Sequence, residues 1–517
     1  MDKRTVIAIG LSILVLLIFQ YFYAPTPVIQ RDNQTQAETA GNESAQKSSA
    51  EQTSESVNVK KLDGSQEEEK TQVKTFNVKT NNLKIAFNSE TGNIYTATVL
   101  QYKDKEFPDL IFKSENGDYL NVLSAKVSDY KHTVKEFNNR YEVQFVGGTK
   151  DIVINKTYII KKDSYFFDLK VTISNISDQT IQTSLGVVIG PGLGKGFEDS
   201  KYMFSGPMIF NGKSVTKEDP EDVEEPIKVD NPSWIGYTSK YFLFSAMNGG
   251  LKKAAIESKG DSKAVVKGSK EVIVNPLDKS VTTFPVFVGP KEYDLLSSYK
   301  YELEESIQFG IFSFISIPML KILNFTYDYV GNYGLAIIVL TFVIKIITYP
   351  LTQKSMTSMK KMQVLQPEMT KIREKFKGEP QKMNAAMMDL YKKHGANPMG
   401  GCLPMVIQIP IFIALYKTLL VSIELKGSPF IFWITDLSLK DPYFITPILM
   451  GLSMFLQQRM TPTGGDPTQQ KIFMFLPLVF TFIFLNFPAG LVIYWLTNNI
   501  LTIAQQYFIN RKIATNK

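Results

Sequence analysis

The chain has 517 residues, too many for one compact domain, and its 57 Lys and Arg against 50 Asp and Glu leave a net charge of only +7. So small a charge over this length argues against nucleic-acid binding, and we expect no sequence-specific recognition of nucleic acid. Cys402 is the only cysteine, so no intramolecular disulfide can form and any exported domain is held together by its core. Residues 30–300 are polar and mixed in charge, whereas residues 301–517 contain nearly all the long apolar runs.

The N-terminal residues predict a membrane anchor followed by a tether. Val6 to Tyr23 is an unbroken apolar stretch, and Lys3 and Arg4 precede it, so the positive-inside rule places the N-terminus in the cytoplasm. A cleaved signal peptide is the alternative, although the stretch is long for one and no A-x-A site follows it. We expect an N-terminal transmembrane anchor at residues 1–24. Residues 25–72 are poor in large apolar residues, which predicts a disordered linker.

From Phe76 onwards the sequence alternates between apolar and polar residues with the period of a β-strand. Turn residues separate the alternating segments, which are 83–87, 141–145, 152–160, 167–173, 272–274 and 284–288. We therefore predict an all-β exported domain of the sandwich type at residues 73–300. His132 is its only histidine, and we find no nucleophile–base set and no cluster of metal ligands in it. We expect no enzyme activity and no cofactor.

Two apolar segments follow this domain. Pro318 divides the apolar part of residues 301–330 into halves too short to cross a bilayer, which predicts an interfacial helix on the exported side of the membrane. Residues 331–352 are long enough to be transmembrane helix 2, although Lys345 interrupts them. Thr341 precedes Lys345 by four residues and shares its helical face.

Lys345 has two interpretations. A charge at the centre of a membrane helix costs roughly 2.5 to 3.5 kcal/mol on insertion scales, so such residues face a protein interior or a water-filled cavity. Because Lys345 lies about one turn from Pro350, its side chain could instead extend to the lipid headgroups. The sequence leaves both interpretations open.

Residues 353–402 predict a cytoplasmic helical hairpin. Ten Lys or Arg stand against four Asp or Glu between Thr352 and Gly401, and such an excess marks a cytoplasmic loop. Met and Leu recur every three to four residues on both sides of the turn at 378–380, which predicts two antiparallel helices. The hairpin could pack only on itself, with a solvated basic face, or it could bind partners.

Residues 403–508 predict transmembrane helices 3–6, and residues 509–517 a cytoplasmic tail. With the anchor and residues 331–352, this gives six transmembrane helices and two cytoplasmic termini. On the last predicted helix a polar stripe recurs at helical spacing, at Tyr494, Asn498, Thr502 and Gln505. Such polar residues inside membrane helices often bond to neighbouring helices, but a shared aqueous groove explains this many polar groups more simply. The predicted groove residues are Lys345, Thr341, Gln408, Gln458, Tyr494, Trp495 and Asn498.

Several short motifs resemble the YidC family of membrane-protein insertases, in its Gram-negative form with a large periplasmic domain. The most specific are 349–352, 365–367, 397–402, 408–412, 441–443, 447–451, 466–467 with 469–471, and 487–491. The resemblance implies a multi-domain protein of the bacterial inner membrane. Its parts would be an α-helical membrane bundle in which five helices form the family core, an all-β periplasmic supersandwich domain and a cytoplasmic helical hairpin. The bundle would enclose a groove open to the cytoplasm and to lipid.

The implied function is insertion and folding of inner-membrane proteins, alone or with the Sec translocon. The implied partners are nascent membrane proteins, the ribosome, Sec translocon components and membrane lipids. The family's groove arginine falls on Lys345, which keeps the positive charge but loses the planar fork of a guanidinium group, and Trp495 stands where some relatives have tyrosine. A small-molecule transporter or channel with Lys345 as an anion site is the alternative, but it predicts internal repeats that we do not find. A third interpretation is that the β-domain is a carbohydrate-processing enzyme. Such an enzyme would need a clustered His, Asp and Glu site, and a domain with one histidine is a poor candidate.

Overall fold

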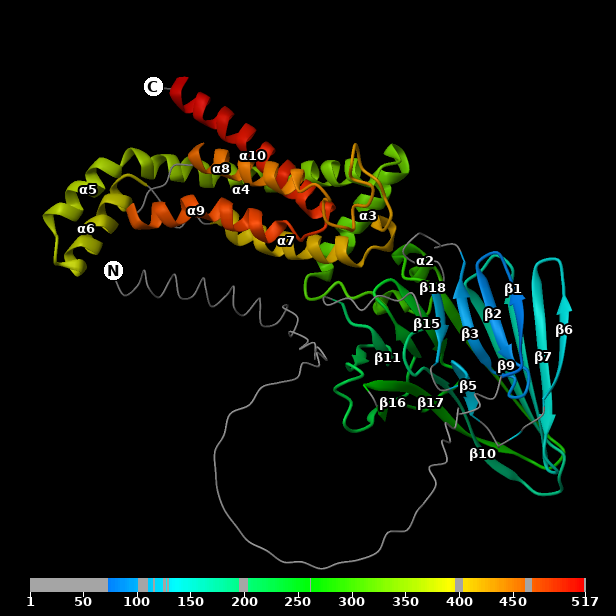
Figure 1. The fold of residues 1–517 in the computed structure, drawn as a ribbon. Coiled ribbons are helices and arrows are strands. Elements are labelled where there is room, and N and C mark those ends of the chain that lie inside the picture. Colours follow the sequence, from blue (N-terminus) through cyan, green and yellow to red (C-terminus); the bar gives the residue numbers. More distant parts are fainter. Residues whose placement is uncertain are drawn as a thin grey trace, which may run out of the picture.

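The computed structural model describes residues 73–100, 110–114, 117–123, 127, 130–194, 203–260, 262–395, 403–460 and 467–515. The predicted anchor at residues 1–24, the predicted linker at 25–72 and Cys402 lie outside the described residues. Figure 1 shows a β-rich part and an elongated helical part that meet near the start of the helices.

The β-rich part consists of two antiparallel sheets. The first contains, in spatial order, β1 (Thr75–Lys79), β2 (Leu83–Asn88), β3 (Ile94–Val99), β5 (Leu120–Leu123), β10 (Ile181–Ile189), β17 (Lys263–Val274), β16 (Lys253–Gly260) and β13 (Ile227–Asp230), with β4 (Leu110–Lys113) paired to β3. The second contains β12 (Val215–Lys217), β11 (Gly206–Phe210), β14 (Trp234–Thr238), β15 (Phe242–Met247), β18 (Lys279–Pro290), β9 (Phe166–Asn175), β8 (Ile152–Lys161), β7 (Arg140–Gly148) and β6 (Lys131–Glu136).

The alternation of apolar and polar residues in the sequence accounts for these sheets. In β8, every second residue from Ile152 to Ile160 is buried and those between are half-buried, so one face of the strand packs on the core. Each fully buried large side chain contributes about 1.5 to 3 kcal/mol to folding. The predicted strands lie within β2, β7, β8, β9, β17 and β18, which confirms the all-β prediction for this part of the chain.

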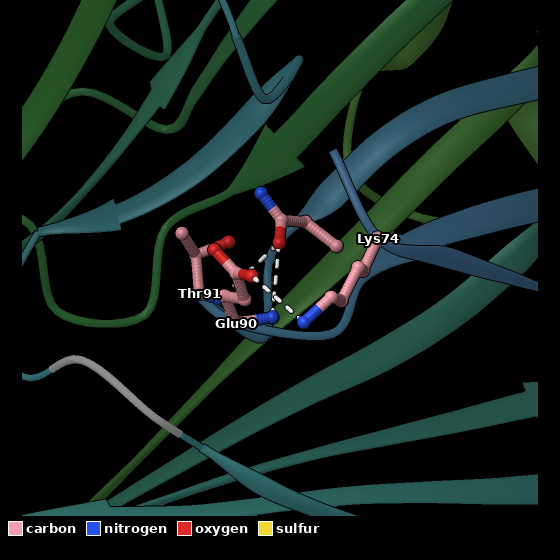
Figure 2. Close-up of polar contacts among 4 residues, drawn as sticks. Lys74, Glu90 and Thr91 are labelled. Atoms are coloured by element: carbon pink, nitrogen blue, oxygen red, sulfur yellow. Dashed lines mark hydrogen bonds and ion pairs between the residues drawn. The ribbon is translucent and has the colours of Figure 1, made fainter. Parts of the chain in front are cut away.

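The turn between β2 and β3 is built on side-chain hydrogen bonds (Figure 2). Asn88 Oδ1 accepts from the backbone N–H groups of Glu90 at 3.0 Å and Thr91 at 3.4 Å, as in an Asx-turn. Lys74 forms a 4.0 Å ion pair with Glu90, but both side chains are exposed, so this pair contributes little. Gly92 has φ 64°, and a Cβ there would lie 2.9 Å from Phe145, which explains the glycine.

A buried lysine lies directly beneath this turn. Lys156 Nζ donates to Thr91 O at 2.8 Å and to Asn93 Oδ1 at 2.7 Å, and it lies 4.6 Å from the centre of the Tyr130 ring. Asp118 accepts from Thr91 Oγ1 at 2.6 Å and from Asn93 Nδ2 at 3.0 Å. Burial lowers the pKa of Lys156 to about 7, although the nearby Asp118 carboxylate opposes this shift.

The helical part begins with the short elements α2 (Tyr293–Ser298) and η1 (Leu303–Ser306). The longer helices are α3 (Ser313–Val330), α4 (Tyr333–Val364), α5 (Gln366–Lys375), α6 (Pro380–Lys393), α7 (Leu403–Val421), α8 (Ile445–Met460), α9 (Pro467–Phe484) and α10 (Ala489–Thr515), with η3 (Ile423–Leu425) after α7. Among the described residues, α4 alone is long and apolar enough to cross a membrane, and 406–421 and 474–484 are shorter apolar helices. The count of six transmembrane helices stays a prediction.

The structure corrects the expectation that Pro318 breaks its segment. Pro318 lies in the second turn of α3, and the helix is continuous from Ser313 to Val330. Contacts with α7 support it, because Ser316 Oγ donates to Ala414 O at 3.0 Å and Thr418 Oγ1 donates to Ser316 O at 3.3 Å. Packing on a neighbouring helix therefore outweighs the hydrogen bond that proline removes.

The helix that carries Lys345 is also longer than the sequence suggested. We expected the span to end at residue 352, but α4 runs through Pro350 to Val364 without a break. Thr348 Oγ1 donates to Ile344 O, and Thr352 Oγ1 donates to Thr348 O, both at 2.9 Å, so the hydroxyl groups on either side of Pro350 are bonded within the helix. The first arm of the predicted hairpin is therefore partly an extension of α4.

Helices α5 and α6 pack side by side, whereas the Met residues expected on the first arm, at 356, 359 and 362, lie on α4. Leu365, Met369 and Leu390 are buried between them, and Gly378, with φ 96°, lies in the connecting turn. Pro380 follows at the first position of α6, where its missing N–H is not needed. The helical hairpin is thus present, and its cytoplasmic location stays a prediction.

Candidate functional site

The Lys345 ammonium group is bonded to α10. Its Nζ atom donates to Thr502 Oγ1 at 2.7 Å and to Asn498 Oδ1 at 3.3 Å. Thr502 Oγ1 itself donates to Asn498 O at 2.6 Å, which leaves its lone pairs for the lysine. The next two residues of α4, Ile346 and Ile347, are exposed. Lys345 therefore lies on the side of α4 that faces α10, between a helix packing surface and an apolar outer face.

Both acceptors of Lys345 are neutral. Among the residues that the structure describes, Lys345 forms no ion pair with a carboxylate. An ammonium group has three N–H donors, and the two hydrogen bonds leave one of them for another acceptor. The geometry thus presents a cation whose charge is not neutralised by its direct partners, next to a largely apolar helix surface.

A second polar contact joins α7 to α10. Gln408 Nε2 donates to Tyr494 Oη at 2.6 Å, and Tyr494 is fully buried one turn before Asn498. Trp495 packs in an aromatic group, with its ring 5.0 Å from Phe412 and 5.2 Å from Phe484. The structure therefore brings α4, α7 and α10 together through predicted site residues.

Two predicted residues are less closely connected. Thr341 is buried, and its Oγ1 donates to Ile337 O of its own helix at 2.7 Å. Gln458 lies half-buried on α8, outside the hydrogen-bonded set around Lys345. The bond between α8 and α10 instead joins Asn499 Nδ2 to Ser453 Oγ at 2.9 Å.

The seven predicted groove residues do not include Thr502 or Ser453, although Thr502 belongs to the polar stripe predicted on the last span. Thr502 carries a signal in the sequence, because it follows Asn498 by four residues and so continues the polar face of α10. A lone serine such as Ser453 is common in packed membrane helices, and nothing in its spacing marks it. Within the described ranges, no three His, Cys, Asp or Glu side chains are grouped so that they could hold a metal ion.

Family comparisons cover both parts of the chain. Residues 325–516 match the family described as "60Kd inner membrane protein", and residues 75–322 match the "YidC periplasmic domain". These matches define a class of inner-membrane proteins with a periplasmic β-domain.

Individual relatives agree with this class. A "Membrane protein insertase YidC" from Geotalea daltonii is 39% identical over 99% of this chain and 100% of the relative. Another from Geobacter sulfurreducens is 44% identical over 70% of this chain and 69% of the relative. A solved structure of an active YidC insertase covers 98% of this chain at 19% identity, with a TM-score of 0.39, too low for a detailed comparison. The chain belongs to the YidC family, which confirms the resemblance of its motifs.

Proposed function

We propose that this protein is an insertase of the bacterial inner membrane that inserts and helps to fold other membrane proteins, alone or with the Sec translocon. The observation that carries the proposal is the Lys345 ammonium group, held inside a long apolar helix by the neutral acceptors Asn498 and Thr502. Family membership supports the same function. The relatives are described as insertases, which also argues indirectly against an enzyme.

The proposed mechanism lowers the cost of moving polar groups into lipid. An unpaired polar group costs several kcal/mol in hydrocarbon, so the exported polar tail of a membrane protein meets a high barrier. A hydrated groove beside α4, α7 and α10 would reduce this barrier. Lys345 would attract acidic residues of the tail through its remaining N–H donor. Gln408 and Asn498, which are half-buried, would offer hydrogen bonds while the apolar segment moves into lipid.

The proposed topology has six transmembrane helices with both termini in the cytoplasm. Residues 73–300 would form the periplasmic domain, 301–330 an interfacial helix and 353–402 the cytoplasmic hairpin. The basic residues of the hairpin support contact with ribosomes and nascent chains, because a basic surface attracts polyanions and acidic segments. The exposed apolar residues on α4, α8 and α9 support contact with membrane lipids.

Substitution of Lys345 tests the role of charge. In vesicles that contain the purified protein, Lys345→Arg should retain insertion of a substrate with an acidic exported tail. Lys345→Met should slow that insertion at least tenfold, and Lys345→Glu should slow it further. Lys354→Met is the matched control, since Lys354 is an exposed lysine farther along the same helix. Equal rates for the Met variants at both positions would contradict the proposal.

Thiol labelling tests the hydrated groove separately. In a Cys402→Ser background, a cysteine in place of Lys345 should react from the cytoplasmic side with a small reagent that cannot cross membranes. A cysteine in place of the exposed Ile347 should face lipid and react much more slowly. If the two cysteines react equally slowly, water does not reach Lys345 and the groove is wrong.

A further inference from the structure

The loop between η3 and α8, residues 426–444, is folded onto one end of the helical part (Figure 1). Asn332, which caps α4, donates from Nδ2 to Phe430 O at 3.0 Å. At the start of α10, Gly490 N–H donates to Leu437 O at 3.0 Å. Ile434 is buried in the helical core, as is Leu437. The inner side of the loop is therefore fixed at the end where α4 and α10 begin.

The outer side of the same loop is apolar and exposed. Phe432 is 85% exposed, and Ile431, Leu439 and Tyr443 are also exposed. Phe432 has φ 54° and Phe444 has φ 56°, a backbone conformation that is rare for bulky residues. The fold thus keeps the Phe432 side chain exposed at the cost of an unfavourable backbone conformation. Such conformations are found mainly at functional sites, for example where a protein binds a ligand.

The polar groups of the loop are largely bonded within the protein. Asp441 Oδ1 accepts from Trp433 Nε1 at 3.0 Å and from Tyr443 N at 2.9 Å, and its Oδ2 accepts from the N–H and the hydroxyl of Thr446, both at 2.7 Å. The Phe430 N–H donates to Ile434 O at 3.0 Å. A loop with satisfied polar groups can enter a region of low polarity at little cost.

We infer that the tip of this loop inserts into the outer leaflet, at the boundary between lipid headgroups and acyl chains. The inference rests on the proposed function, which places the start of α8 at the periplasmic surface. The apolar tip continues into the exposed face of α8, which carries Ile445, Ile448 and Leu452. Trp and Tyr favour this boundary in membrane proteins, and the loop carries the half-buried Trp433 and the exposed Tyr443. Lys440 Nζ lies 5.9 Å from the Phe444 ring, so in this placement its ammonium group would lie at the level of the lipid phosphates.

Fluorescent labels at three positions test this placement in the full-length protein. In a Cys402→Ser background, single cysteines replace Phe432, Ile448 or Leu277, and each carries a bimane label in phosphatidylcholine vesicles. Leu277 is the matched control, because it is 84% exposed with φ 55° in the β17–β18 turn, at the opposite end of β18 from the end that leads into α2. Iodide on both sides of the membrane reports contact with water. Lipids brominated near the headgroup or at mid-chain report depth.

Iodide should quench the Phe432→Cys label at least fivefold less than it quenches the Leu277→Cys label. Lipids brominated near the headgroup should quench the Phe432→Cys label at least twofold more than lipids brominated at mid-chain. Equal quenching of these two labels by iodide would overturn the inference. So would protection from iodide without quenching by either brominated lipid, since a protein surface would then cover the tip. The Ile448→Cys label separates this failure from failure of the proposed function. If it too is quenched by iodide and not by lipid, α8 does not cross the membrane.

Discussion

The buried lysine beneath the β2–β3 turn makes the stability of the β-rich part depend on pH. Lys156 has a pKa of about 7 in the folded protein because of burial, whereas an unfolded lysine titrates near 10.4. Between these values the unfolded state binds more protons, so stability rises with pH from about 7 to about 10 and is independent of this group below that window. From pH 7 to pH 9 the gain from Lys156 is roughly 2 kcal/mol.

Urea unfolding of the full-length protein in detergent measures this gain. Trp234 is fully buried in β14, so a Trp433→Phe, Trp495→Phe background makes it the reporter of the β-rich part. Lys156→Met should show a rise in the free energy of unfolding between pH 7 and pH 9 that is about 2 kcal/mol smaller than in the parent. Burial also lowers the pKa of Lys291 to about 7, with Lys217 adding to the shift, but Lys291 is present in both proteins and cancels. An identical pH dependence in the two proteins would refute the reasoning.

Two further predictions concern the helical part. Reversing the charges of Lys371, Arg373, Lys375 and Lys377 on and after α5 should weaken co-sedimentation with translating ribosomes at low salt, and unchanged binding would assign these residues to a solvated surface. Burial opposes ionisation of Asp441, but the hydrogen bonds from Thr446, Tyr443 and Trp433 outweigh it and lower the pKa of this carboxyl group. Asp441→Ala should therefore reduce the free energy of unfolding by about 1 to 3 kcal/mol at pH 7, with a smaller loss below about pH 4, and a loss independent of pH would contradict this account.

Local sequence patterns predicted the features that depend on one segment. The alternation in β8 indicated a half-buried strand, and the four-residue spacing of Tyr494 and Asn498 placed them on one face of α10. The motifs indicated the family. Such features follow from the periods of strands and helices, which act within a few residues.

Features that depend on distant segments could not be predicted in this way. The continuity of α3 across Pro318 depends on hydrogen bonds with α7, which follows it by about a hundred residues. The contact between Lys345 and Thr502 joins helices separated by the hairpin and three other helices. The burial of Lys156 depends on a turn more than sixty residues earlier. In each case, tertiary packing decides between alternatives that the local pattern leaves equal.

Because α4 is uninterrupted, one continuous helix connects the hairpin to Lys345. At 1.5 Å per residue, about 28 Å of helix separate Lys345 from Val364, next to which α5 begins. A stiff helix transmits a tilt at one end to the other, so a tilt of the hairpin would shift Lys345 unless α4 bends between them. Pro350 is the point at which α4 bends most readily, because proline removes one backbone hydrogen bond and helices kink at proline. Pro350 lies only about 7.5 Å from Lys345, so about three quarters of the helix between Lys345 and Val364 lies on the hairpin side of the proline.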